Sequence, residues 1–325
     1  MMDYQTSLTP ILQTRKMNNK QHAPVLAQEA IEGLNIKPSG IYIDGTFGRG
    51  GHARLILENL SANGKLIVID KDETAIKTAK KMLGKDKRCH IYHTSFIEID
   101  KIAKELKIEN KVNGILLDLG VSSPQLEDET RGFSFLRDGP LDMRMNVTQS
   151  MDAATWLTQT NANELAQVLK TYGEEKFAKR IAHAIIKARD IAPIKTTKQL
   201  ADIISRANPK WEKHKHPATR SFQAIRIFIN KELEELQNCL DKILDVLVVG
   251  GKLAVISFHS LEDRIVKRFI QKHVSGDLPI GVPVKHKELK PRLKKIGRVI
   301  KPSEEELNIN PRARSAKLRI AEKLL

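Results

Sequence analysis

The feature that most constrains this chain is a short apolar segment that leads into a glycine-rich turn. Residues 41–52 read Ile-Tyr-Ile-Asp-Gly-Thr-Phe-Gly-Arg-Gly-Gly-His, which predicts a strand, a tight loop and the start of a helix. The next apolar segment, 65–70, ends in Asp70. Glycines let a backbone approach a ligand closely, and a carboxylate after the second strand suits the two hydroxyls of a ribose. The segment therefore predicts a nucleotide-type cofactor site.

The position of Asp44 narrows the class of cofactor. The glycine spacing is not G-x-G-x-x-G, and a dinucleotide site leaves its helix N-terminus free for a pyrophosphate. Asp44 at the mouth of the loop would repel a phosphate and attract a cation. S-adenosylmethionine carries a sulfonium and an amino group but no phosphate, so these residues favour it over NAD.

Further apolar segments alternate with helical patterns along the chain. Strands are predicted at 41–44, 65–70, 89–93, 114–118 and 252–257, and helices at 53–60 and 73–83. Such alternation predicts an α/β fold with a parallel sheet and a ligand site at the carboxyl ends of its strands. Asp44, Asp70 and Asp118 all fall at those ends, and three such acids in series are not explained as helix caps.

The stretch between Asp118 and Lys252 is too long for one crossover connection. Apolar residues at helical spacing predict a crossover helix over 221–247, and the remainder, 126–217, is predicted to be a helical insert. The alternating residues 316–321 predict a last, antiparallel edge strand. We therefore expect an N-terminal extension at 1–20, a sheet domain in two parts at 21–125 and 218–325, and the insert between them.

The charge balance predicts a polyanionic partner. The chain has 55 basic and 39 acidic residues, a net charge of +16, with basic runs at 285–298 and 312–319. An excess of this size favours nucleic acid. No apolar run approaches the ~20 residues needed to span a bilayer, and the first twenty residues lack a secretory pattern. Cys89 and Cys239 form no C-x-x-C pair, so we expect no structural metal and a reducing, cytoplasmic location.

Several longer motifs resemble one family, the bacterial 16S ribosomal RNA cytosine-N4 methyltransferases (RsmH, or MraW). The resemblance covers about residues 22–322, with the motifs in the family's order. They are His-Ala-Pro-Val-Leu at 22–26, the glycine loop at 44–52, Asp-Leu-Gly-Val-Ser-Ser-Pro-Gln at 118–125, Arg-Gly-Phe-Ser-Phe at 131–135, Gly-Pro-Leu-Asp-Met-Arg-Met at 139–145, Phe-Gln-Ala-Ile-Arg at 222–226, Ile-Ser-Phe-His-Ser-Leu-Glu-Asp at 256–263 and Asn-Pro-Arg-Ala-Arg-Ser-Ala-Lys at 310–317.

The resemblance implies a Rossmann-like class I methyltransferase sheet with an inserted helical domain that recognises the substrate. It implies methyl transfer from S-adenosylmethionine to N4 of a cytidine in the decoding centre of 16S rRNA, with the small ribosomal subunit as partner. A homodimer stays an open alternative. The cofactor contacts that it implies are Gly50, Gly51, His52, Asp70 on the ribose, Phe96 beside the adenine, Asp118 and Gln125.

Methylation of an exocyclic amine requires hydrogen-bond acceptors, because the N4 lone pair of cytosine is delocalised into the ring. DNA amino-methyltransferases place an Asp/Asn/Ser-Pro-Pro-aromatic loop after the fourth strand, and residues 122–125, Ser-Ser-Pro-Gln, are a relative of it without the aromatic. Phe133 or Phe135 is the candidate for the missing stacking role. We expect Ser123 and Asp142 to accept hydrogen bonds from N4.

Other polar residues have two interpretations each. His259 follows the fifth strand and either faces the substrate or bonds to local backbone, and Arg144 is either a phosphate ligand or a solvated turn residue. His214 and His216 lie among lysines and favour RNA contact over metal binding. Three other functions compete: a DNA cytosine-N4 methyltransferase, a non-catalytic RNA-binding assembly factor, and a nicotinamide-dependent oxidoreductase, which Asp44 and the charge disfavour.

Overall fold

The structure, a computed structural model, describes residues 24–211, 216–275 and 290–325. The N-terminal extension at 1–20, His214 and the first part of the basic run, Lys285 and Lys287, lie outside the described residues. None of the described helices has the length and apolar character needed to cross a membrane.

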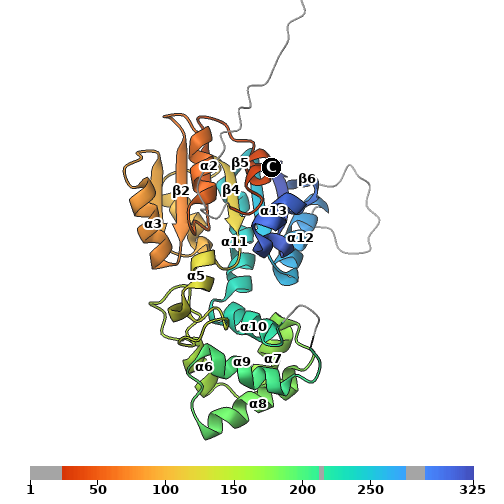
Figure 1. The fold of residues 1–325 in the computed structure, drawn as a ribbon. Coiled ribbons are helices and arrows are strands. Elements are labelled where there is room, and N and C mark those ends of the chain that lie inside the picture. Colours follow the sequence, from red (N-terminus) through yellow and green to blue (C-terminus); the bar gives the residue numbers. More distant parts are fainter. Residues whose placement is uncertain (1–23, 212–215, 276–289) are drawn as a thin grey trace, which may run out of the picture.

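A seven-stranded sheet forms the larger part of the molecule, with strand order β3-β2-β1-β4-β5-β7-β6 (Figure 1). Strands β1 to β5 are parallel, and β7 is antiparallel to both of its neighbours. The predicted strands at 41–44, 65–70 and 89–93 are confirmed residue for residue, and those at 114–118 and 252–257 lie within longer strands. The bounds are β1 Ile41–Asp44, β2 Lys65–Asp70, β3 Cys89–His93, β4 Val112–Asp118, β5 Leu247–Ser257, β6 Leu293–Ile300 and β7 Lys317–Lys323.

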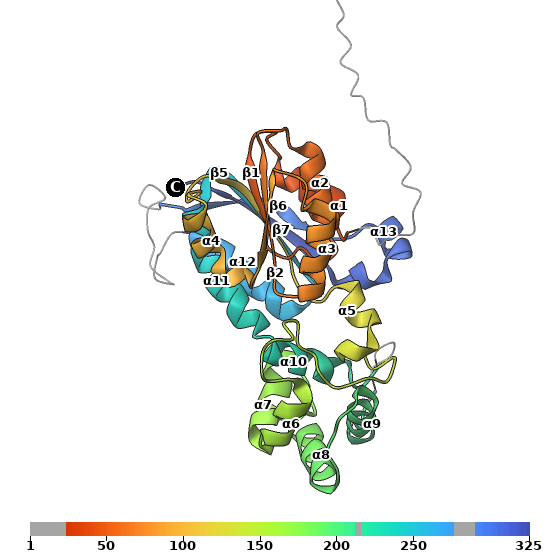
Figure 2. The same cartoon turned by 90° about the vertical axis from the view of Figure 1, so that its left-hand side faces the viewer.

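Helices cover both faces of the sheet, which explains why its central strands are continuous apolar runs. Figure 2 shows α1, α2 and α3 on one face and α4, α11 and α12 on the other. Each layer has its own buried core against the strands, one around Ile56 and Leu66, the other around Leu117 and Ile243. The bounds are α1 Ala27–Leu34, α2 Gly51–Asn59, α3 Glu73–Leu83, α4 Ile99–Glu105, α11 Glu232–Val246 and α12 Ser260–Ser275.

A second, helical unit lies next to the sheet, at the carboxyl ends of its parallel strands (Figure 1). Its apolar core joins Trp156, Ile181, Leu200 and Ile225, among others, so the predicted helical insert is present. That core extends to Ile229, beyond the expected boundary at 217. The helices of this unit are α6 Ala153–Gln159, α7 Ala162–Gly173, α8 Ala178–Ile191, α9 Thr197–Ala207 and α10 Thr219–Ile229, and the short α5 Ser123–Glu127 leads into it.

The predicted single crossover helix over 221–247 is wrong. The structure has two helices, α10 and α11, separated at Asn230 and at Lys231, whose φ is +51°. The Asn230 side chain accepts from the Met145 amide and donates to the Met143 carbonyl, both at 2.7 Å. The apolar residues keep their helical spacing through this break because both helices bury one face. Helix α10 buries its apolar face in the helical unit, and α11 buries its own against the sheet.

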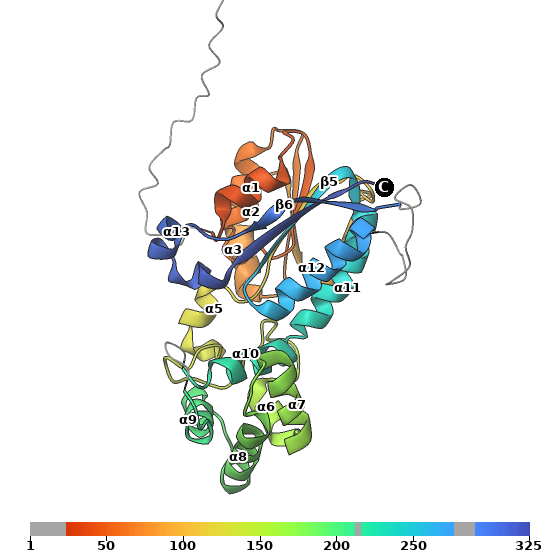
Figure 3. The same ribbon diagram turned by 90° about the vertical axis from the view of Figure 1, so that its right-hand side faces the viewer.

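The expected antiparallel strand near the C-terminus is confirmed as β7, but it is not an edge strand. It pairs with β5 on one side and with β6 on the other (Figure 3). Strand β6 reads Leu-Lys-Lys-Ile-Gly-Arg-Val-Ile, and its lysines belong to a run that we interpreted only as a basic stretch. Lysines on an edge strand are typical, because charge opposes pairing with another chain.

Candidate active site

The carboxyl ends of β1, β2 and β4 open into a cavity of about 690 Å³. This volume is within the range of small-molecule sites. Strand β1 pairs with both β2 and β4, which brings Asp44, Asp70 and Asp118 to one edge of the sheet, as predicted. Asp70 and Asp118 line the cavity directly, whereas Asp44 is buried behind them with 1% of its surface exposed.

Glycines shape the wall of this cavity between β1 and α2. Gly50 has a φ of +74°, and a Cβ atom there would lie 2.5 Å from Cζ of Phe47, so only glycine fits without strain. The amide of Gly48 donates to Oδ2 of Asp70 at 2.8 Å. The loop after β1 thereby holds the acid that ends β2, and Gly50, Gly51 and His52 all line the cavity.

Asp70 is fixed by backbone on both of its oxygens. Oδ1 accepts from the Asp72 amide and Oδ2 from the Gly48 amide, each at 2.8 Å. Burial raises the pKa of this carboxyl, and the two amides oppose that shift in part. The result is a preoriented carboxylate at the position that we predicted for ribose contact.

Asp44 and Asp118, the acids that end β1 and β4, have fewer partners for their charge than Asp70 has. Burial raises the pKa of Asp44 to about 7, although His52 and the Thr46 amide act against that shift. For His52, burial opposes the charged form, but Asp118 and Asp44 outweigh it and raise its pKa. Its Nε2 lies 3.6 Å from Oδ2 of Asp118.

Two buried carboxylate oxygens in this group, Oδ2 of Asp44 and Oδ1 of Asp118, have no hydrogen-bond partner within the described part of the chain. Unpaired buried carboxylates are costly, so a cationic ligand in the adjoining cavity would offset part of that cost through its charge. These acidic side chains therefore fit the positively charged amino and sulfonium groups of S-adenosylmethionine.

The remaining predicted cofactor residues also line the cavity. Phe96 begins the turn after β3, is partly buried and packs close to Gly45. Gln125 is buried in α5, accepts from the Ser122 amide at 2.8 Å and donates to Asp72 at 2.7 Å. Asp72 also pairs with Arg131 at 2.8 Å. Burial opposes ionisation of Asp72, but Gln125 and Arg131 outweigh it and lower its pKa.

The three predicted catalytic residues separate in the structure. Ser123 lines the cavity at the start of α5, but Asp142 and His259 do not. Both oxygens of Asp142 face Arg144, at 2.8 and 2.7 Å, and Arg144 donates further to the Gln149 carbonyl. The structure thus does not bring Asp142 to the pocket, and Arg144 is an ion-pair partner rather than a free phosphate ligand. Phe133 and Phe135, the stacking candidates, do not line the cavity either. Phe135 packs instead on Phe222 and His216.

An ion-pair network on the opposite wall was missed by the sequence reasoning. Arg226 of α10 pairs with Glu232 at 2.8 Å, and His259 lies 3.1 Å from Glu262, which also accepts from the Phe258 amide. Arg226, Glu232 and Glu262 line the cavity. Glu232, His259 and Glu262 are close enough together to ligate a cation, but both oxygens of Glu232 lie within 2.9 Å of Arg226, which supplies the positive charge. Arg226 and Glu262 lie in motifs that carried the resemblance, but His259 was the only residue of this network singled out from the sequence, and Glu232 lies outside those motifs.

The strand order, with its antiparallel seventh strand, and the acids around a glycine loop define a class I S-adenosylmethionine-dependent methyltransferase. Within that class the chain belongs to the MraW methylase family, which matches residues 19–324.

Its relatives include proteins named "Ribosomal RNA small subunit methyltransferase H". The one from Coxiella burnetii is 58% identical over 303 residues, which is 93% of this chain and 99% of that protein. The one from Legionella pneumophila is 57% identical over 305 residues, 94% of this chain and 99% of that protein.

Among solved structures, an rRNA methylase from Streptococcus thermophilus is similar with a TM-score of 0.43 and 12% identity, covering 94% of this chain and 99% of that one. A SAM-dependent O-methyltransferase from Thermotoga maritima is similar with a TM-score of 0.41 and 13% identity, covering 95% of this chain and 69% of that one.

Proposed function

We propose that this protein transfers the methyl group of S-adenosylmethionine to N4 of a cytidine in the decoding centre of 16S ribosomal RNA. The observation that carries the proposal is one cavity with two kinds of wall. Asp70, Asp118 and the glycines of the β1–α2 loop line its sheet side, and the rest is lined by residues of other segments, namely Ser123, Met145, Arg226 and Glu262. The names of the relatives, which match almost the full length of this chain, support ribosomal RNA of the small subunit as the substrate. The net charge of +16 agrees with an RNA partner.

In this proposal the sheet side of the cavity holds the cofactor. Asp70 accepts hydrogen bonds from the ribose hydroxyls, Phe96 flanks the adenine, and Asp118, His52 and Gln125 surround the methionine part with Gly50 and Gly51. S-adenosylmethionine supplies an electrophilic methyl group on a positively charged sulfur. Asp70 and Asp118 on the cavity wall, with Asp44 behind them, would hold the cationic form of this cofactor.

The loop that follows β4 orients the base. The Ser123 hydroxyl accepts an N–H of the cytosine amine, which turns the nitrogen lone pair toward the methyl carbon. Gln125 keeps this loop rigid, because it bonds the Ser122 amide and Asp72 at once. Asp142 does not contact the base in this scheme. It binds Arg144 and so fixes the loop that places Met145 on the cavity wall. His259 positions Glu262 from behind the wall. The target base leaves its stack to enter the cavity.

Two substitutions test the base-orienting role. Ser123→Ala should lower kcat about 10- to 100-fold at unchanged cofactor affinity, because one acceptor of the transition-state geometry is lost. Asp142→Ala should change kcat by less than about threefold and act on stability instead, since a partly buried pair is broken. Turnover with small subunits and calorimetric cofactor binding measure these effects. Wild-type turnover in Ser123→Ala would remove Ser123 from the mechanism.

The substrate itself is tested by methylating small subunits from a strain that lacks the enzyme, with isotope-labelled cofactor. Mass spectrometry of the digested RNA should find the label in N4-methylcytidine, and Asp70→Ala protein serves as the inactive control. Label in another nucleoside would refute the proposal. Label in a DNA duplex but not in subunits would favour the DNA cytosine-N4 alternative.

A further inference from the structure

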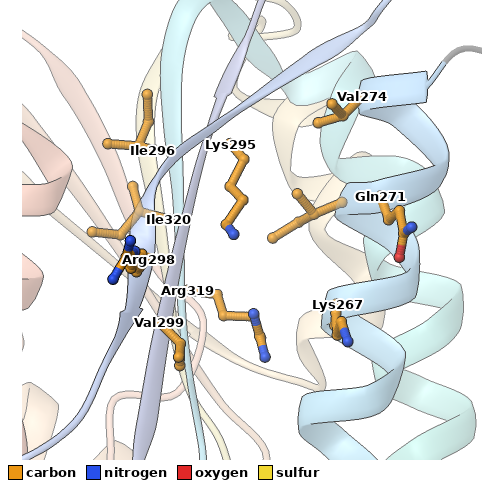
Figure 4. A pocket seen from close by; sticks show the side chains of 10 residues that line it. Lys267, Gln271, Val274, Lys295, Ile296, Arg298, Val299, Arg319 and Ile320 are labelled. Atoms are coloured by element: carbon orange, nitrogen blue, oxygen red, sulfur yellow. The ribbon is translucent and has the colours of Figure 1, made fainter.

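A second cavity, of about 290 Å³, lies away from the active site between α12 and the strands β6 and β7. We call it the α12–β6 groove. Figure 4 shows Lys295 and Arg319 extending from the strands toward the helix, and Lys267 and Gln271 on the helix wall. Nothing in the proposed methyl transfer uses this groove.

The groove is strongly cationic. Lys267, Lys295, Arg298 and Arg319 line it, and its described lining contains no acid. Arg319 is neutralised, because its Nε lies 2.6 Å from Oδ1 of Asp263. The other three are exposed, and the described part of the chain offers none of them an ion-pair partner. Unpaired cations around a concavity attract an anion.

The floor of the groove is apolar, with Ile270 and Val274 from α12 and Val299 from β6. Val274 is 37% exposed, which leaves apolar surface open to a ligand. Phosphates would engage the ammonium groups, while a ribose or base covers the aliphatic floor. This combination fits a nucleotide chain better than a bare anion, which would leave the floor uncovered.

The start of α12 links the active-site cavity to the groove. Glu262 lines the active-site cavity, and the next residue, Asp263, pairs with Lys317 and Arg319 of β7. Lys317 in turn is the ladder partner of Ser257, the last residue of β5. A strand of RNA that leaves the cavity over the start of α12 would run toward the groove, whose wall includes Arg319 of β7.

We infer that the α12–β6 groove binds a single-stranded segment of the same RNA whose target base enters the active site, with Lys267 and Lys295 each contacting a phosphate. The inference rests on the proposed function for the identity of the RNA. Two phosphate contacts on a single strand contribute about 1.4 to the log–log salt slope, which corresponds to roughly tenfold in affinity at physiological salt.

The test is the double variant Lys267→Gln/Lys295→Gln. We expect its affinity for a short fluorescein-labelled single-stranded RNA to fall about tenfold in anisotropy titrations, and its salt slope to fall by about 1.4. The KM for small subunits should rise, while kcat at saturation and cofactor affinity stay at the wild-type values. The matched control is Lys85→Gln/Lys87→Gln, which removes the same charge from the exposed turn before β3, at the opposite edge of the sheet. It should bind RNA as the wild type does.

Equal losses in the double variant and its control would overturn the inference, because the effect would then be one of net charge. Unchanged RNA binding with a raised KM for subunits would overturn it as well, since the groove would then contact a ribosomal protein. The proposed function fails separately, if wild-type protein methylates a nucleoside other than cytidine or an atom other than N4. The RNA titrations do not depend on that result.

Discussion

The active-site cavity and the α12–β6 groove lie on one sheet but treat charge in opposite ways. At the cavity, Asp44 is buried, and one oxygen of Asp44 and one of Asp118 are buried without a hydrogen-bond partner among the described residues. In the groove, the unpaired cations are exposed to water. A buried unpaired charge destabilises the free protein and is worth a great deal to a ligand that pairs with it, whereas an exposed charge costs little and is screened by salt. The cavity is thus suited to one small ligand held tightly, and the groove to a long ligand held by many weak contacts.

The sharpest test of this contrast removes one carboxylate that lines the cavity and one that pairs with a cation of the groove. Asp70→Ala should weaken cofactor binding about 100-fold or more, since the charge-assisted hydrogen bonds that we propose to the two ribose hydroxyls would be lost. Asp263→Ala should leave cofactor affinity unchanged and strengthen RNA binding, because Arg319 and Lys317 lose their acidic partner. Isothermal calorimetry and RNA titration measure both variants, with urea unfolding as the control for folding. Similar cofactor losses in the two variants would break the contrast.

A second test compares two glycines with positive φ, one in each region. Gly50 has a φ of +74° and the Phe47 ring against it, and Gly297 of β6 has a φ of +63° with open space around it. Gly297→Ala should cost about 1 kcal/mol of unfolding free energy for the backbone strain alone. Gly50→Ala should cost about 1–3 kcal/mol more, since Phe47 must shift. Equal losses in urea denaturation would mean that the cavity wall is no more tightly packed than the groove wall.

The smallest effect expected is on pH dependence, and it belongs to the cavity. The folded pKa of Asp44, about 7, lies above the ordinary aspartate value of 3.8. Its stabilising contribution to the free protein is therefore complete below about pH 4 and is lost as the pH rises through about 7. Cofactor affinity should change the other way and rise up to about tenfold from pH 6 to pH 8, because the cation favours the ionised carboxylate.

Asp44→Asn is the control for this pH effect. It should flatten both profiles, in thermal unfolding without ligand and in calorimetric titration with it. His52, Asp118 and Asp70 face Asp44 and remain in the variant, so a profile unchanged by the substitution would assign the pH effect to one of them instead.

Sequence patterns predicted the parts of the site that depend on local order. A strand that ends in an acid needs only its own apolar run, and parallel pairing then brings Asp44, Asp70 and Asp118 together without further information. The loop residues Gly50 and Gly51 and the start of α5 follow the same logic. Their positions in the cavity agree with the prediction, and their roles await the tests above.

The predictions that were wrong or missing concern features that depend on how distant segments pack. Asp142 is turned away from the cavity by Arg144, two residues on, and no periodicity reports that pairing. Arg226 and Glu232 meet across the break at Asn230, and that break is hidden because the apolar spacing runs through it. Strand β6 was missed because a charged edge strand looks like a solvated run.

The break at Asn230 has one further consequence. Lys71, the residue after the ribose-binding candidate Asp70, donates to the Asn230 carbonyl at 3.0 Å and pairs with Glu235 at 2.8 Å. The joint between the two halves of the molecule is therefore bonded to the loop that would hold the cofactor. If a rotation of the helical unit altered this bond and thereby the position of Asp70, the rotation and cofactor binding would be coupled, each changing the other's equilibrium by the same factor.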